Sequence, residues 1–328
     1  MDFRLLTLAD KPFLDMALGT NPPEISELTF TNLFCWQAKR RIWINRNSES
    51  RDQNAEPGEW NRAQANGQDR IGVEDLRGQV GESAGVEGLV LLCEEQGRRF
   101  FLPPVCACDV KSVAQAMFEH AQAAGFEPVM ERVPEAMAEE LARSGFRLEE
   151  DRANWDYVYL VSDLARLEGR RYDGKRNFVK QALASYGCEY RRITAENVSD
   201  CLAMETSWCN LRHCELDPGL EAEQRAIAAC FGNWAQFPLI GGAVRVDGAI
   251  QAFSIAERLN PTTAVVHFEK ANPELRGMYQ LINHWFAQNE LSGFTYVNRE
   301  QDLGIEGLRK AKESYHPHHM VRKFTVRP

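Results

Sequence analysis

The stretch Asn298–Pro317 reads NREQDLGIEGLRKAKESYHP and directly follows the apolar run FTYV. Short apolar runs rich in aromatic and β-branched residues are typical of buried strands, so FTYV predicts a strand. The segment that ends at Tyr315 has a helical pattern of basic residues. A strand followed by a helix indicates an α/β fold, in which the residues just after a strand lie where open sheets place their ligands. Here these residues are Asn298, Glu300 and Asp302.

The length of 328 residues allows two domains that each bury a core. The composition, with 44% hydrophobic and 26% charged residues, is that of a globular protein. No apolar run approaches the roughly 20 residues that cross a bilayer. The first residues, MDFRLLTLADK, contain an early Asp and no long apolar segment of the kind found in secretion signals. We therefore expect a cytoplasmic protein without a membrane span.

The formal net charge of −9 argues against a protein that coats nucleic acid, because that binding depends on Lys and Arg. A tRNA partner is not favoured by this charge, although the local basic segment 170–180 leaves it possible. The nine cysteines include no CxxC pair, so we expect neither a disulfide framework nor a zinc ribbon. The cluster HPHH (316–319) lacks a second ligand pair at a zinc-like spacing, so we expect surface histidines and no metal. The sequence does not indicate the oligomeric state.

Both halves of the chain predict the same order of elements, βααβββαβαβ. We assign residues 1–164 to the first half and 165–328 to the second, which opens with a basic connecting helix. Residues 46–84 are polar and nearly free of aliphatic side chains, so we expect a mobile insertion there. Such an order predicts an α/β fold in the broad sense. The sheets are mixed, as in α+β proteins, and helices lie on both faces.

Five motifs carry a resemblance to a known family: SELTFTNLFCW (26–36), GKRNFVKQ (174–181), HFEKAN (267–272), RGMYQLIN (276–283) and the opening stretch. Together they resemble the bacterial family of unassigned function that is named after the C-terminal domain of phosphatidylglycerol lysyltransferase. The element order resembles the Gcn5-related N-acetyltransferase fold, and two copies in tandem are similar to the Fem-type aminoacyltransferases. The resemblance covers nearly the whole chain apart from 46–84. It implies two tandem domains of this fold.

In the acetyltransferase fold, the loop before the third helix turns N–H groups toward the pyrophosphate of coenzyme A. The first half offers Pro103 and Pro104, which lack an N–H, and Asp109, which repels phosphate, so we interpret this half as degenerate. The second half offers a cation at Arg276 and close backbone approach at Gly277. The expected donor- and anion-binding residues are Arg276, Gly277, Tyr279, Lys175 and Arg176.

Glu269 and Tyr315 are the candidate catalytic residues. By the two-residue period of a strand, His267 and Glu269 share one face, and Glu269 can deprotonate an incoming ammonium there. Its alternative is an ion pair with Lys270 or Arg276. The resemblance implies that Tyr315, on the last helix, protonates the departing thiolate; its alternative is a tyrosine that packs in the core.

Carboxylates near the strand end suit a cationic amine, whereas the arginines beside them suit a carboxylate or phosphate. We therefore expect an amino-acid or aminoacyl substrate at this place. The alternative is a buried network that only holds the last helix to the sheet. The expected substrate-binding residues are Lys270, Asn298, Glu300, Asp302 and Arg309.

The first functional hypothesis is an acyl- or aminoacyltransferase that moves an acyl group to an amine by direct attack. It requires no cofactor beyond the donor substrate, which is an acyl-CoA thioester or an aminoacyl-tRNA. The acceptor is a small-molecule amine or an amino acid. The alternative is a non-catalytic module that keeps the cleft and binds a metabolite.

Overall fold

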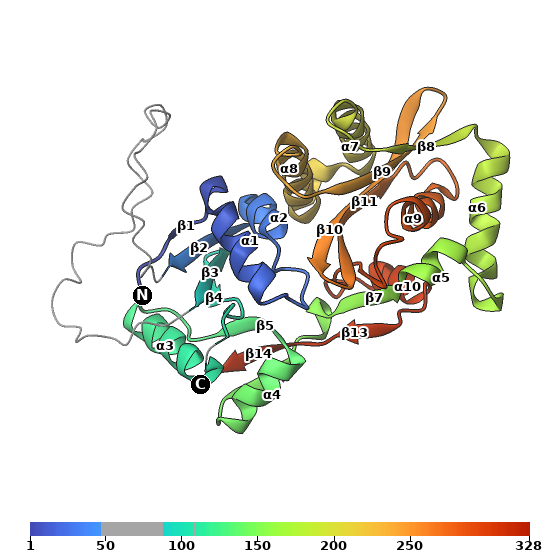
Figure 1. The fold of residues 1–328 in the computed structure, drawn as a ribbon. Coiled ribbons are helices and arrows are strands. Elements are labelled where there is room, and N and C mark those ends of the chain that lie inside the picture. Colours follow the sequence, from blue (N-terminus) through green and yellow to red (C-terminus); the bar gives the residue numbers. More distant parts are fainter. Residues whose placement is uncertain (47–87, 108) are drawn as a thin grey trace, which may run out of the picture.

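The computed structural model describes residues 1–46, 88–107 and 109–328. Two seven-stranded mixed sheets form the protein, one for each half (Figure 1). The insertion predicted over 46–84 lies outside the described residues, except for Arg46, the last residue of strand β2. No helix in the described ranges is long and apolar enough to cross a membrane.

The first sheet has the strand order β1-β2-β3-β4-β5-β14-β6. Helices α1 and α2 precede β2, and α3 and α4 flank β5, in the order that the sequence predicts. Gly125 and Gly145, both at positive φ, follow the ends of α3 and α4 as predicted. The elements are β1 (Arg4–Leu5), α1 (Lys11–Thr20), α2 (Phe30–Cys35), β2 (Arg40–Arg46), β3 (Leu89–Glu95), β4 (Arg98–Phe101), α3 (Val110–Ala123), β5 (Met130–Pro134), α4 (Glu135–Arg143), β6 (Arg147–Glu150) and β14 (Lys323–Arg327).

The second sheet has the order β13-β7-β12-β11-β10-β9-β8. Helices α7 and α8 pack on one face, while α9 packs on the other beside α5 and α6. The elements are β7 (Asp156–Leu160), α5 (Val161–Arg166), α6 (Asp173–Ser185), β8 (Cys188–Arg192), α7 (Val198–Arg212), α8 (Pro218–Gly232), β9 (Ile240–Val246), β10 (Ala249–Asn260), β11 (Thr263–Ala271), α9 (Met278–Asn289), β12 (Tyr296–Asn298), α10 (Glu306–Glu313) and β13 (His319–Val321).

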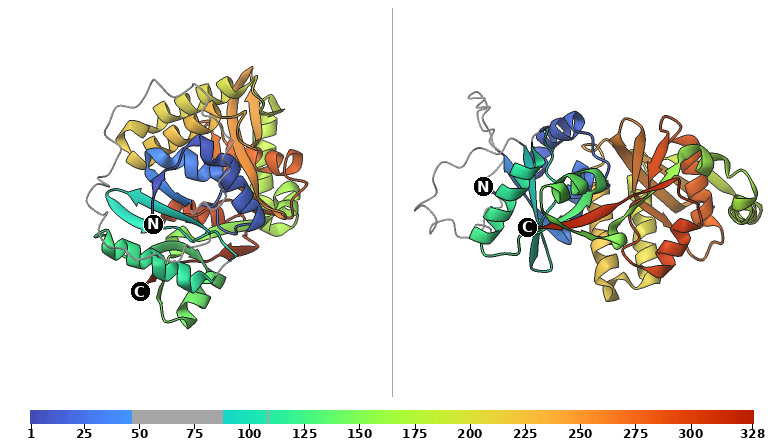
Figure 2. Two further views of the ribbon diagram at one scale, coloured as in Figure 1. Left: turned by 60° about the vertical axis from the view of Figure 1, so that its left-hand side comes forward. Right: turned by 90° about the horizontal axis from the view of Figure 1, so that it is seen from below.

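The two sheets exchange one strand each. Strand β7 from the first half lies between β13 and β12, and strand β14 from the second half lies between β5 and β6. Figure 2 shows the C-terminal segment, drawn in red, crossing from one half into the other. A boundary at residue 164 therefore divides the sequence but does not separate the two sheets.

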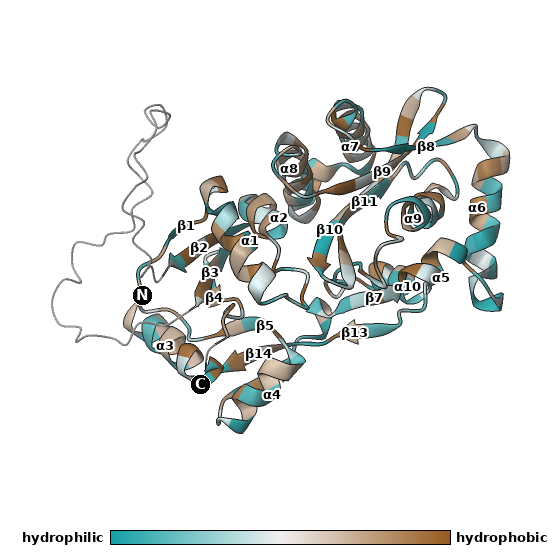
Figure 3. Ribbon diagram, viewed as in Figure 1, coloured by the Kyte–Doolittle hydropathy of each residue, from teal (hydrophilic) through white to brown (hydrophobic). Residues whose placement is uncertain are grey.

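Apolar packing also joins the halves. One hydrophobic cluster combines Leu33 and Ile42 of the first half with Phe231 and Phe253 of the second. Hydrophobic residues are frequent in the strands, whereas the helices alternate hydrophobic and hydrophilic segments (Figure 3). Burial of this shared apolar surface stabilises the two halves as one body.

Candidate functional site

The candidate site lies where β11 and β12 separate. The two strands pair in parallel only from Thr263–Tyr296 to Val265–Asn298. Strand β11 then continues to Ala271 against β10, while the chain after Asn298 turns away. The turn is shaped by Glu300 at a φ of 56°, whose N–H donates to Oδ1 of Asn298 at 2.8 Å. Both diverging segments carry buried ionisable side chains.

His267 bridges the separated strands on the side that faces the first half. Its Nε2 lies 2.8 Å from Oε1 of Glu257, and its Nδ1 lies 3.0 Å from Oε1 of Glu300. Burial opposes protonation of the imidazole, but the hydrogen bonds to the two carboxylates outweigh it and raise the pKa of His267 to about 10. His267 is therefore a buried imidazolium at neutral pH.

A β-bulge places His267 there. The register between β10 and β11 shifts between the pairs Ile255–Phe268 and Ala256–Val266, which leaves His267 as the extra residue. The prediction that His267 and Glu269 share one face is therefore wrong, because the bulge breaks the two-residue alternation. Glu269 bonds to Asn283 on α9, at the opposite face of the sheet.

The first half contributes three polar residues to this bridge. Thr31 donates to Oε2 of Glu257 at 3.1 Å, and the Asn32 amide lies 3.4 Å from Oε1 of Glu300. Arg40 donates in turn to Oδ1 of Asn32 at 3.1 Å. The site residues predicted from the sequence include none of these three. The motif SELTFTNLFCW, which contains Thr31 and Asn32, is the signal that could have found two of them.

Glu269 and Tyr315, the two candidate catalytic residues, meet around Arg299 on the α9 side. Arg299 donates to Oε1 of Glu269 at 2.8 Å, and its guanidinium lies 4.9 Å from the ring centroid of Tyr315. Asn283 donates to the other oxygen of Glu269 at 3.1 Å. Burial raises the pKa of the Tyr315 hydroxyl well above its usual range, with Arg299 opposing the shift, so the phenol stays protonated.

Two lysines lie beside this group with lowered pKa values. Nζ of Lys175 on α6 is 3.8 Å from the Tyr315 ring centroid and 2.6 Å from Oγ of Ser314. Lys312 donates to the backbone carbonyls of Arg299 and Glu300. Burial, helped by the charge of Arg299, lowers the pKa of both lysines to about 8. The α9 side of the opening is thus a region rich in positive charge around one carboxylate.

Asp302 and Arg309, predicted to bind substrate, form a structural clamp instead. Arg309 donates two hydrogen bonds to Asp302, at 2.8 and 3.0 Å, and Arg152 and Tyr157 donate at 3.0 and 2.7 Å. The backbone N–H of Gly304 donates at 2.8 Å. Although burial opposes ionisation, these bonds hold the pKa of Asp302 well below its usual range. These donors occupy both oxygens of Asp302, which favours the alternative of a buried network that holds the last helix, and substrate binding by Asp302 stays a prediction without support from these contacts.

Asn298 is likewise held inside the protein. Its amide donates at 2.9 Å to Asp156, a fully buried carboxylate that also accepts from Lys323 of the exchanged strand β14 at 2.7 Å. Lys323 also contacts Glu27 of the first half at 2.6 Å. This network links the strand end to the first sheet, so the structure gives Asn298 an architectural role. Glu300, bonded to His267, is the one predicted acidic substrate residue after β12 that remains at the opening.

The predicted anion-binding residues are arranged around α6 rather than around a free loop. A Cβ at Gly277 would lie 2.3 Å from the carbonyl oxygen of Phe178, so the close backbone approach predicted there is made by α6. Arg276 lies over the Phe178 ring at 5.3 Å, and Arg176 donates to the carbonyls of Leu167 and Gly169. These contacts give Gly277 and Arg176 packing roles, and anion binding by them stays a prediction.

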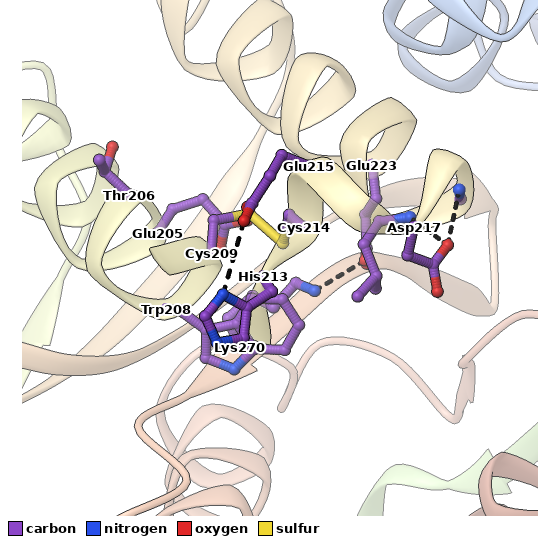
Figure 4. Close-up of a disulfide and its surroundings, with 12 residues drawn as sticks. Glu205, Thr206, Trp208, Cys209, His213, Cys214, Glu215, Asp217, Glu223 and Lys270 are labelled. Carbon is purple, nitrogen blue, oxygen red and sulfur yellow. Dashed lines mark hydrogen bonds and ion pairs between the residues drawn. A yellow bond between two sulfur atoms is a disulfide. The ribbon is translucent and has the colours of Figure 1, made fainter. Parts of the chain in front are cut away.

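Lys270 lies on the α7 side of β11, and the hydroxyl of Tyr279, a residue of α9, reaches Trp208 on α7. Nζ of Lys270 bonds to Glu223 at 2.7 Å and lies 3.7 Å from the Trp208 ring (Figure 4). The Trp208 indole donates to Tyr279 at 3.1 Å. Lys270 therefore does not join the Glu269 group. A disulfide between Cys209 and Cys214 closes the neighbouring turn. It is a local bridge, and a search for CxxC pairs does not find its spacing.

Two cavities open elsewhere on the described surface. One of 320 Å³ lies between the halves and is lined by Glu24, Tyr296 and Arg322, among others. The other, of 730 Å³, follows α7 past Trp208 to Glu274. Glu269 and Tyr315 line neither of these two cavities, and the side chains of Arg299 and Glu269 are 14% and 12% exposed.

Comparisons with known proteins place this geometry in a class. The crystal structure of a conserved protein of unknown function from Bacteroides thetaiotaomicron VPI-5482 matches with a TM-score of 0.80 and 30% identity, over 99% of both chains. FemX matches with a TM-score of 0.53 and 11% identity, over 99% of this chain and 97% of that one. The structure of L-PGS from Bacillus licheniformis matches with a TM-score of 0.51 and 13% identity, over 73% and 80%. The predicted fold, two tandem acetyltransferase-like domains with mixed sheets, is confirmed.

A match to a protein-family model identifies the family of the chain. The model described as phosphatidylglycerol lysyltransferase, C-terminal, matches residues 82–327. The chain therefore belongs to this family, as the motifs predicted. No curated protein matches the chain.

Proposed function

We propose that this protein transfers an acyl or aminoacyl group from a thioester or an aminoacyl-tRNA to an amine, at the place where β11 and β12 separate. The observation that carries the proposal is that Arg299 holds Glu269 and Tyr315 together in a buried site. A base and an acid are the two groups that direct attack by an amine needs. Membership of a family named after a lysyltransferase supports the same reaction class.

In the proposed reaction the acceptor amine attacks the donor carbonyl as the free base. A carbon–nitrogen bond forms, and the bond from carbon to the thioester sulfur or to the ester oxygen breaks. Glu269 takes the proton that the nitrogen loses, and the Tyr315 hydroxyl gives a proton to the leaving group. Because burial raises the pKa of Tyr315, its hydroxyl is protonated at neutral pH and can donate to the leaving group.

The positive charge on the α9 side suits the phosphates of either donor. Lys175 and Arg299 lie beside Tyr315, and the exposed Arg276 lies on the outer surface of α6 at the start of α9. A phosphate-bearing donor would meet these cations in succession. Because Lys175 of α6 contacts Tyr315 and Ser314, we propose that α6 shifts when the donor binds.

The test is a transfer assay. The protein is incubated with acyl-CoA thioesters or aminoacyl-tRNA and a panel of amines, and amide products are detected by mass spectrometry. We expect product with the wild type and strongly reduced product with Glu269→Gln and with Tyr315→Phe. Glu274→Gln, an exposed carboxylate without an ion pair in the described ranges, is the matched control. Saturable donor binding without any product from all combinations would support the non-catalytic binding module instead.

A further inference from the structure

Two buried polar atoms beside Glu269 lack a hydrogen-bond partner among the described residues. They are Oδ1 of Asn283, an acceptor, and Nη1 of Arg299, a donor. Asn283 is 5% exposed, and the side chain of Arg299 is 14% exposed. Leaving such a group unpaired costs about 1–3 kcal/mol. An unpaired acceptor and an unpaired donor beside the same carboxylate therefore indicate a ligand that donates to the first and accepts from the second.

Glu269 fixes the orientation of both unpaired atoms. Its two oxygens accept from Nδ2 of Asn283 at 3.1 Å and from Nη2 of Arg299 at 2.8 Å. Since a carboxylate only accepts, the amide of Asn283 must turn its NH₂ group to Glu269 and keep its oxygen free. The guanidinium is planar, so Nη1 is held in a fixed direction relative to Nη2.

We infer that Asn283 and Arg299 recognise the amide that the proposed reaction makes, and its two halves before they join. Nη1 of Arg299 receives the carbonyl oxygen of the acyl group, and Oδ1 of Asn283 receives an N–H of the acceptor amine. During attack the carbonyl oxygen gains negative charge, which a guanidinium donor stabilises more than it stabilises the neutral carbonyl. The inference rests on the proposed function and adds the residues that bind the reacting atoms.

Other ligand classes fit the pair less well. A carboxylate would bond to Arg299 but would face Oδ1 of Asn283 and the carboxylate of Glu269. A simple cation would suit Asn283 and Glu269 but would lie beside the guanidinium. A neutral group with one carbonyl and one N–H satisfies both unpaired atoms without adding charge. A bound water can also satisfy both, and the experiment separates that case.

The experiment compares an amide with its ester in the absence of any donor. N-butylacetamide and butyl acetate have the same length, with an N–H in the amide where the ester has an oxygen, and their dissociation constants are measured by NMR titration. The ester carbonyl is also the weaker acceptor, so the preference is assigned to Asn283 only as far as Asn283→Leu removes it. We expect the wild type to bind the amide about tenfold more tightly than the ester, because only the amide can donate to Asn283. Asn283→Leu removes this preference, with Asn283→Ser as a second variant if the first does not fold. Arg299→Lys weakens amide and ester equally.

The controls are Asn289→Leu on the same helix and Arg191→Lys on an exposed strand, which leave both affinities unchanged. Equal affinity for amide and ester in the wild type, or no binding of either up to the solubility limit, overturns the inference, because water alone then fills the place. Transfer activity with no amide preference would overturn this inference and leave the proposed function standing. If the protein has no transfer activity but prefers the amide, and Asn283→Leu abolishes this preference, then the proposed function is overturned and the amide site stands.

Discussion

The two sheets contain the same opening and fill it differently. In the first sheet, β4 and β5 pair only at Phe101–Met130. The chain after β4 is apolar, with Leu102 and Val105 buried, and on the β5 side only Glu131 and Arg132 are charged. Asp109 caps α3 by accepting from the N–H of Lys111 at 3.2 Å. In the second sheet the corresponding segments carry His267, Glu269, Lys270, Arg299 and Glu300. An opening filled by apolar groups needs only close packing, whereas charges need partners on every side.

The extra bracing of the second opening comes largely from the first half. Thr31 and Asn32 hold the glutamates that flank His267, and Glu27 holds Lys323 beside Asp156. The first half therefore has fewer charges at its own opening, where Glu131 pairs with Arg98 and Arg132 lies beside Glu27, and it completes the opening in the second half. The contrast can be tested at both openings, and four changes follow in order of expected effect.

The largest effect is expected for Glu269→Gln. Removing the base should lower turnover about 10²- to 10⁴-fold, because general base catalysis contributes that much. Glu131→Gln in the first sheet, whose carboxylate pairs with Arg98, should leave turnover unchanged. Steady-state kinetics with the best donor and amine measure both. Equal losses for the two variants would show that both openings take part in catalysis.

Phe101→Ala should lower the free energy of unfolding by about 3–5 kcal/mol, because it leaves a cavity in the apolar opening. Phe101 is fully buried, and its ring contacts those of Phe3 and Phe126. Urea denaturation gives the stability, and ligand binding by the folded protein should not change. A loss below about 1 kcal/mol would mean that the first opening is not filled by packing as the structure indicates.

His267→Gln should destabilise the protein most at low pH. The folded pKa of about 10 lies above the usual histidine pKa of about 6.5, so the stabilising proton is fully bound below that usual value and is lost as the pH rises through 10. The stability difference between wild type and variant should therefore shrink by about 3 kcal/mol between pH 6 and pH 9. Taking the difference cancels the titrations of Lys175 and Lys312. A difference that is independent of pH would show that His267 is not a charged bridge.

Asp302→Asn should cost about 2 kcal/mol of stability, because hydrogen bonds between charged groups are replaced by weaker ones. Ligand binding should survive, since Asp302 has no oxygen free for a ligand. Thermal melting and an NMR titration of the same sample measure the two effects. If the variant loses ligand binding while its stability is unchanged, Asp302 belongs to the substrate site and is not a structural clamp.

Local chemistry in the sequence predicted much of the fold. Gly125 and Gly145 mark helix ends because positive φ is unstrained only for glycine, and the run FTYV contains Tyr296 and Val297, the first two residues of strand β12. The strand exchange could not be predicted in this way. Strand β14 is as compatible with its own half as with the other, and only the packed structure decides between them.

The sequence predicts the position of a candidate residue where a strand or helix sets it. It does not predict the position where hydrogen-bond partners from distant segments set it. Glu269 on β11 and Tyr315, two residues past the end of α10, both lie against Arg299, and their catalytic roles stay predictions. Asp302 and Glu300 look alike in sequence, yet two arginines saturate one and a histidine meets the other. The bulge at His267 adds one residue that no alternation of apolar and polar positions reveals.

The exchange of β7 and β14 has a consequence for how the protein is made. Thr325 pairs with Glu149, so the first sheet is completed only after the whole of the second has been translated. Neither half can then fold ahead of the other on the ribosome, and contacts so distant in sequence slow folding. If the halves arose by duplication of one ancestral gene, the strand exchange made each half depend on the other. Each sheet now contains one strand that the other half supplies.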